Sequence, residues 1–153
     1  MNGRAYRIVK AKHVDGAMSG AGARLFGGRW NSAGVPVVYA ASSVALAQLE
    51  MLVHLDREAL MASYRVLTLA FDRRWVTKPG PEAFGPGWDA EPAGAASQCV
   101  GDRWAAAGKT ALLRVPSAVV PTEFNYLLNP RHARFASVQV QETGRCRFDA
   151  RLR

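Results

Sequence analysis

Apolar positions along the chain alternate in some segments and recur every three to four residues in others. Alternation or a short continuous apolar run predicts a strand, and the longer period predicts a helix. Strands are predicted at Tyr6–Lys10, Val35–Ala41, Tyr64–Phe71, Thr110–Val115, Ser117–Val120 and Ala136–Gln141. Helices are predicted at about Val44–Leu55, capped by Ser42 or Ser43, and at about Ala95–Ala107, ended by Gly108.

The segments between these elements are rich in turn-forming residues. Asp15–Gly34 contains many glycines, which predicts a loop whose backbone comes close to another group. We expect an irregular excursion at Arg73–Pro92 and a polar loop with aromatic residues at Glu123–Pro130. The basic tail from Arg145 is an edge strand or a frayed end. Because regular strand–helix–strand repeats are few, the pattern predicts an α+β fold with a mixed or antiparallel sheet.

Composition narrows the class of protein. A chain of 153 residues that is 49% apolar suits one compact domain over residues 1–153 with a core of its own. The two cysteines form no CxxC pair and lie near no histidine cluster, so we expect no metal site. Without a signal peptide or an apolar run of about 18 residues, we expect a soluble cytoplasmic protein that does not enter a membrane.

The charge of the chain predicts an anionic partner without choosing among several. The net charge is +8, and most of the basic residues are arginines. Arginine binds phosphate and carboxylate groups with a planar pair of donors. Nucleic acid, a phosphorylated small molecule and an acidic protein therefore all remain open.

Glu50 is the most informative single residue. In the predicted helix it lies four residues after Leu46 and three before Val53, beside the apolar stripe. A carboxylate is costly to bury without a partner. Glu50 is therefore either a functional group or one half of an internal ion pair, with Arg7 or Arg29 as the candidate partner.

Four other positions are candidates, and three of them have a structural alternative. Arg29 follows two glycines and could hold a phosphate, or it could be a surface residue of a turn. Tyr39 could stack on a flat ligand or be a core tyrosine. Ser117 lacks the Gly-x-Ser-x-Gly pattern of a hydrolase nucleophile. Asn125 could bind a ligand or cap a loop.

In combination and in order, these segments resemble the RES domain, a family named for its Arg, Glu and Ser. The resemblance covers nearly the whole chain and is weakest at residues 73–96 and in the basic tail. It rests on Tyr6–Val9, Gly27–Gly34, Pro36–Ser42, Ala45–Glu50, Val53–His54, Gly101–Asp102, Val115–Pro121 and Asn125–Pro130.

The resemblance implies a fold, a substrate and a partner. RES domains have an ADP-ribosyltransferase-like fold, a split mixed β-sheet with flanking helices that clasps NAD. Family members are toxins of toxin–antitoxin pairs and are inhibited by an antitoxin with a Xre-like helix-turn-helix domain. DNA contact would then be only indirect, through the antitoxin, and a homo-oligomer within the complex is left open.

Carried onto this chain, the resemblance makes Arg29 the functional arginine, with Arg7 as a second candidate for the pyrophosphate contact. The functional glutamate and serine are Glu50 and Ser117. Tyr39 and Asn125 match further positions. We expect Glu50 to stabilise the charge that develops when the nicotinamide–ribose bond of NAD breaks, and Ser117 to orient either Glu50 or a ribose hydroxyl.

The acceptor is left open by the sequence. Water or phosphate would make the chain a NAD glycohydrolase or phosphorylase, and a protein side chain would make it an ADP-ribosyltransferase toxin. The charge keeps two rivals in view: an RNA-binding or RNA-cleaving toxin that uses exposed tryptophans, and a non-catalytic domain that binds an acidic partner.

Overall fold

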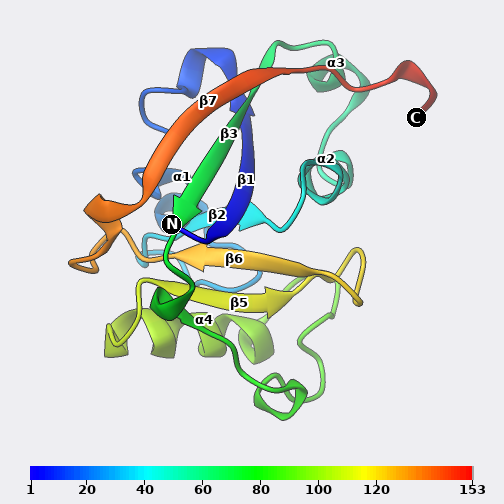
Figure 1. Ribbon diagram of the computed structural model, residues 1–153. Helices are drawn as coiled ribbons and strands as arrows, with labels where there is room; N and C mark the ends of the chain where they lie inside the picture. The colour runs from blue at the N-terminus through cyan, green and yellow to red at the C-terminus, as the bar shows by residue number, and fades with distance from the viewer. Residues whose placement is uncertain (153) are drawn as a thin grey trace.

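The protein is built on one seven-stranded sheet in the order β4-β5-β6-β2-β1-β3-β7 (Figure 1). The computed structural model describes residues 1–152. Neighbouring strands are antiparallel except β4 and β5, which are parallel, so the sheet is mixed as expected. The strands are β1 (Gly3–Lys10), β2 (Val38–Ala41), β3 (Tyr64–Phe71), β4 (Val76–Thr77), β5 (Leu112–Pro116), β6 (Phe124–Leu128) and β7 (Gln139–Cys146).

The sheet is split between β1 and β2. These two strands share a single aligned pair, Tyr6 with Ala41, whereas β1 and β3 pair along their whole length. One group of strands therefore contains β1, β3 and β7, and the other contains β2, β6, β5 and β4. Figure 1 shows the two groups running in clearly different directions, with α2 beside the place where they meet. The α+β fold with a split mixed sheet is confirmed.

The helices flank the sheet and largely follow the predicted bounds. They are α1 (Ala21–Phe26), α2 (Val44–Leu52), α3 (Arg57–Leu60) and α4 (Ala95–Ala107), with 3-10 turns η1 (Ala11–His13), η2 (Arg73–Trp75), η3 (Pro81–Ala83), η4 (Phe135–Ser137) and η5 (Ala150–Leu152). Helix α4 has the predicted bounds, and Gly108 ends it in the left-handed conformation. Ser43 caps α2 by accepting a hydrogen bond from Leu46 N.

Helix α2 is shorter than the apolar pattern predicts. It ends at Leu52, because His54 N turns back to Met51 O in a tighter three-residue step and breaks the helical ladder. The glycine-rich segment Asp15–Gly34 is also not all loop, since α1 forms inside it.

Two predictions in the C-terminal half were wrong, one of a loop and one of a strand. The expected polar loop Glu123–Pro130 contains β6, which pairs with β2 on one side and β5 on the other. The expected strand Ser117–Val120 is a turn instead. The hydroxyl of Ser117 accepts hydrogen bonds from the backbone N–H groups of Val119 and Val120, which bends the chain away from an extended path.

Buried side chains form three clusters around the sheet. One cluster lies among β1, β2, β3 and β5 and includes Phe71, a second lies under α2 and includes Leu46, and a third surrounds Trp30 and Trp104 beside α4. The second and third clusters hold the elements on either side of the split. No helix within residues 1–152 is long and apolar enough to cross a membrane.

Candidate active site

A cavity of about 260 Å³ lies where the two groups of strands diverge. Residues of β1, β2, α2 and β6 line it, together with His54 and Leu55 just after α2. Most of the lining is apolar, and the polar groups Arg7, Glu50 and Asn125 converge on it from three different elements. An apolar pocket with a few converging polar groups is the usual form of a small-molecule site.

Glu50 reaches this cavity from the inner face of α2, one turn beyond the buried residues Leu46 and Ala47. Its Oε1 accepts hydrogen bonds from Ser117 Oγ and Asn125 Nδ2, both at 2.6 Å. Oε2 receives none from any residue among 1–152. One carboxylate oxygen is therefore anchored, and the other is left for a ligand. The ion pair with Arg7 or Arg29 that we considered does not form among the described residues.

Ser117 and Asn125 act as the support of this carboxylate. Ser117 is fully buried, and its hydroxyl donates to Glu50 while it accepts from two backbone N–H groups. That hydroxyl is saturated, which suits orientation of Glu50 and not nucleophilic attack. Asn125 lines the cavity, and its Oδ1 is buried without a hydrogen-bond partner. An orphaned buried acceptor beside a cavity points to a missing donor.

Arg7 lines the cavity from β1. Its Nε donates to Ala17 O at 3.0 Å, and Nη1 donates to Tyr39 O at 2.8 Å. Burial lowers the pKa of the Arg7 guanidinium, which nevertheless stays charged because arginine titrates so high. No carboxylate among residues 1–152 lies within ion-pair distance of Arg7. Arg7 is half-buried, and a cation that bonds only to carbonyl oxygens among the described residues is a natural anchor for an anionic ligand.

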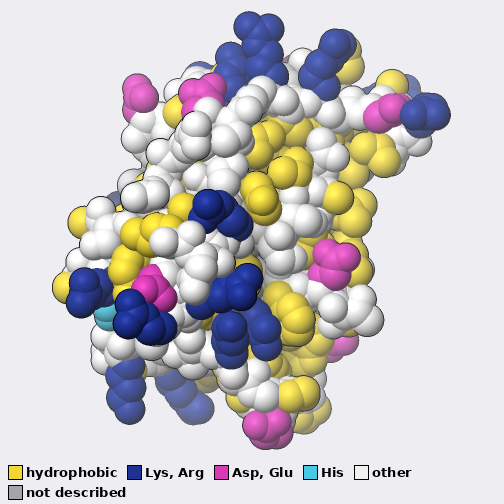
Figure 2. All heavy atoms as spheres, in the orientation of Figure 1, with side chains coloured by type: hydrophobic (Ala, Val, Ile, Leu, Met, Phe, Trp, Pro, Cys, Tyr) yellow, Lys and Arg dark blue, Asp and Glu magenta, His cyan; other side chains and the backbone are white. Residues whose placement is uncertain are grey.

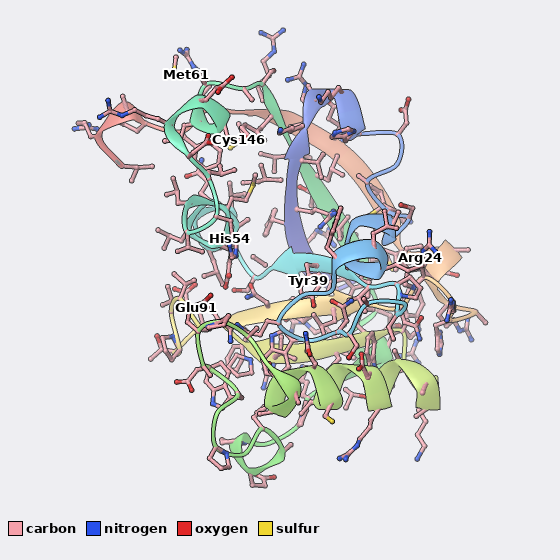
Figure 3. The ribbon with its side chains drawn as sticks, turned by 180° about the vertical axis from the view of Figure 1, so that it is seen from behind. Arg24, Tyr39, His54, Met61, Glu91 and Cys146 are labelled. Atoms are coloured by element: carbon pink, nitrogen blue, oxygen red, sulfur yellow. The ribbon has the colours of Figure 1, made fainter. Side chains whose placement is uncertain are left out.

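Tyr39 lines the same cavity and is held by its hydroxyl. The hydroxyl donates to Asn31 Oδ1 at 2.6 Å and accepts from Trp30 N at 3.1 Å. Burial raises the pKa of Tyr39, so the phenol stays neutral. Figure 3 shows Tyr39 on β2, between the two groups of strands, and His54 at the end of α2. The ring is thus fixed in orientation at the wall of the cavity.

Arg29 is not among the residues that line this cavity. Its guanidinium donates to the carbonyl oxygens of Trp88 and Ala90, at 3.1 and 2.8 Å, and pairs with Glu91 at 2.9 Å. In this structure Arg29 anchors the irregular excursion between β3 and α4. The structure therefore brings together Arg7, Tyr39, Glu50 and Asn125, with Ser117 behind them, and leaves Arg29 outside.

A hydrogen-bond network that includes Asn31 and Asp102 supports Tyr39, and the sequence patterns predicted no role for either residue. Asn31 is fully buried, and its Nδ2 donates to Ala23 O and Val35 O. Asp102 on α4 accepts from the backbone N and the hydroxyl of Ser32. The signal for Asn31 was its place directly after Gly27–Trp30, but an asparagine in a turn is too common to single out.

Comparison with known proteins identifies the family to which the chain belongs. The family model described as "RES domain" matches residues 4–149. A protein named "Prs ADP-ribosylating toxin" from Sphingobium sp. (strain YBL2) is 43% identical over 140 residues, which covers 88% of this chain and 86% of that protein. A protein named "Toxin Res" from Yersinia enterocolitica is 36% identical over 152 residues, covering 97% and 98%.

A solved structure supports the fold independently. A chain in the crystal structure of the M. tuberculosis MbcT-MbcA toxin-antitoxin complex superposes with a TM-score of 0.69 at 23% identity. The superposition covers 95% of this chain and 84% of that chain. The ADP-ribosyltransferase-like fold expected from the sequence is therefore confirmed. From the family match over residues 4–149 and these relatives, the chain belongs to the RES domain family.

Proposed function

We propose that this chain is the toxin of a toxin–antitoxin pair and cleaves NAD at the bond between nicotinamide and ribose. The observation that carries the proposal is the carboxylate of Glu50, anchored through one oxygen only, in an apolar cavity that also holds the half-buried guanidinium of Arg7. Glu50 can stabilise the positive charge that develops on the ribose, and Arg7 can bind the anionic pyrophosphate of a dinucleotide. The name of the 43% identical relative, an ADP-ribosylating toxin, also supports NAD as the substrate.

Glu50 would act on the reacting sugar. When the bond from ribose C1 to the nicotinamide nitrogen breaks, the electron pair leaves with nicotinamide, which departs neutral. Positive charge develops on C1 and the ring oxygen, as in glycoside cleavage. A fixed carboxylate oxygen stabilises that charge best where water is excluded. Glu50 Oε2 is the free oxygen, and the two short bonds to Oε1 hold it in place without further reorganisation.

Arg7 and Tyr39 would position the substrate. Arg7 offers its remaining N–H groups to the pyrophosphate, and Tyr39 presents a fixed ring against which the nicotinamide can pack. Asn125 would keep the carboxylate of Glu50 in place beside the sugar, through the hydrogen bond from its Nδ2. A cavity of about 260 Å³ is close to the lower end for small-molecule sites and suits the nicotinamide half of NAD.

The acceptor of ADP-ribose distinguishes two functions. Water or phosphate as acceptor makes the chain a glycohydrolase or phosphorylase that depletes NAD. A protein side chain as acceptor makes it an ADP-ribosyltransferase, which the name of the Sphingobium relative favours. An RNA-directed function is less well supported, because Trp88 stacks on Trp30, Trp104 is buried, and Trp75 is half-buried with the guanidinium of Arg134 over its ring.

The partner would be an antitoxin, proposed here to carry a Xre-like helix-turn-helix domain through which DNA is reached. A toxin–antitoxin complex among the structures of the same fold is consistent with this partner. We also propose that residues 1–153 act as one catalytic domain in the cytoplasm.

The test is product analysis with purified protein and NAD, with and without inorganic phosphate. ADP-ribose identifies hydrolysis, ADP-ribose 1-phosphate identifies phosphorolysis, and a mass increase on an added protein identifies transfer. Nicotinamide release is expected in all three cases. If no nicotinamide appears while NAD still binds, the catalytic proposal fails and a non-catalytic binding domain replaces it.

A further inference from the structure

A second cavity, of about 380 Å³, lies at the β4–β5 edge of the sheet. It shares no lining residue with the cavity at the split. Arg74 and Trp75 from η2 line it, with Lys109 from the turn after α4 and with His132 and Arg134 from the segment between β6 and η4. Three segments far apart in the sequence thus bring cationic side chains to one hollow.

The side chains around this hollow include more cationic groups than acidic ones. Arg74 is paired with Asp72, at 2.7 Å, and that pair lowers the pKa of Asp72 to about 2. Neither Lys109 nor Arg134 pairs with an acidic side chain among residues 1–152. Figure 2 shows Lys and Arg side chains gathered at the lower left of this face, with acidic and His side chains among them. The hollow therefore carries an uncompensated positive charge.

His132 adds a directed donor. Its Nδ1 accepts a hydrogen bond from Arg134 N at 3.0 Å, so a neutral ring carries its proton on Nε2. The same bond joins His132 to the backbone of Arg134, whose guanidinium lies over the ring of Trp75 at 5.9 Å. The imidazole N–H, with Lys109 and Arg134, which have no acidic partner among residues 1–152, suits a group with several acceptor oxygens.

The walls of the hollow are held before any ligand binds. The hydroxyls of Thr77 and Thr110 hydrogen-bond at 2.6 Å, which fixes β4 to the turn that carries Lys109. Asn129 N donates to Ala111 O, and His132 N donates to Asn129 O, so the His132 segment is tied to the same turn. A preformed site loses less conformational entropy on binding.

We propose that this second cavity binds a compact phosphate-bearing small molecule with at least two negative charges, of the pyrophosphate or nucleoside diphosphate class. The ligand is compact because the cations converge on one concave site, whereas a nucleic acid strand needs cations spaced along a groove. The volume of the cavity lies within the range of small-molecule sites. This site is separate from the NAD cavity and does not depend on the function proposed there.

The test is calorimetric titration of the purified chain with inorganic pyrophosphate. At the second cavity we expect one bound pyrophosphate, whose affinity falls about tenfold or more in the double variant Lys109→Gln/Arg134→Gln, since each lost cation removes a charge-assisted contact. Arg57→Gln, an exposed arginine on α3, is the matched control and should bind as the wild type does. Both altered side chains of the double variant are exposed, so circular dichroism should show the same melting temperature for all three proteins.

A second variant separates the two cavities. Arg7→Gln removes the cation of the first cavity, where the pyrophosphate of NAD is proposed to bind, and should leave the pyrophosphate binding that depends on Lys109 and Arg134 unchanged. Binding that is lost in Arg7→Gln and kept in the double variant would assign the anion to the first cavity and overturn the proposal. Absence of pyrophosphate binding by the wild type would also overturn it. Tighter binding of a single-stranded RNA, with a steep loss of affinity in salt, would reassign the surface to nucleic acid.

Discussion

Replacement of Glu50 by glutamine isolates the charge of the carboxylate from its shape. The amide oxygen of glutamine can still accept from Ser117 Oγ and Asn125 Nδ2, the two donors that hold Oε1 at 2.6 Å. The free oxygen, Oε2, becomes an uncharged NH₂ group. The side chain should therefore keep its position, and the fold should remain intact.

The expected loss follows from Coulomb's law. A carboxylate at roughly 4 Å from the developing ribose charge, with an effective dielectric constant of about 20, contributes about 4 kcal/mol. Each 1.36 kcal/mol corresponds to about tenfold in rate, so Glu50→Gln should slow turnover about a thousandfold. The affinity for NAD should change much less, because the charge develops only on the way to the transition state.

The assay is nicotinamide release at saturating NAD, together with calorimetric NAD binding and a thermal melt. Glu58→Gln, at an exposed glutamate on α3 outside the cavity, is the matched control. Turnover by Glu50→Gln within about threefold of the wild type, with the fold unchanged, would refute the role of the carboxylate.

Three further outcomes test the surroundings of this carboxylate. Arg7→Gln should weaken NAD binding about tenfold or more. Arg29→Gln should mainly lower the melting temperature, because it releases the segment that contains Glu91. If calorimetry gives equal NAD affinities for the wild type and Arg7→Gln, the pyrophosphate contact belongs to Arg29. Gly101→Ala should lower the free energy of unfolding, measured with denaturant, by at least about 2 kcal/mol, since a Cβ there would overlap Trp30 O. An unchanged unfolding midpoint would show that α4 can shift to make room for it. Tyr39→Phe should lower the free energy of unfolding by about 1–3 kcal/mol at neutral pH, because Trp30 N and Asn31 Oδ1 lose their hydrogen-bond partner. Because burial raises the folded pKa of Tyr39 above its ordinary 10.0, the wild type should lose stability as pH rises past that value, and Tyr39→Phe should lose less; identical pH profiles in thermal melts would contradict this.

Elements with a strong local signal were predictable from the sequence. The apolar period and Gly108 located α4, the alternation of β3 located that strand, and Ser43 located the start of α2. These succeed because caps and one-sided burial act within a few residues. The same helical spacing also put Glu50 on an inward face, where it does line the cavity.

What the sequence by itself determined was thus the class of fold, the bounds of its most periodic elements and the inward position of Glu50. Tertiary structure decided the rest. Phe124–Leu128 is a strand because β2 and β5 pair with both of its edges, and Ser117 leaves the extended state because its hydroxyl binds Glu50 and two backbone N–H groups. It also decided that Arg7, and not Arg29, lines the cavity. Strand pairing and the partner of a buried charge depend on groups distant in the chain, whose positions no local pattern records.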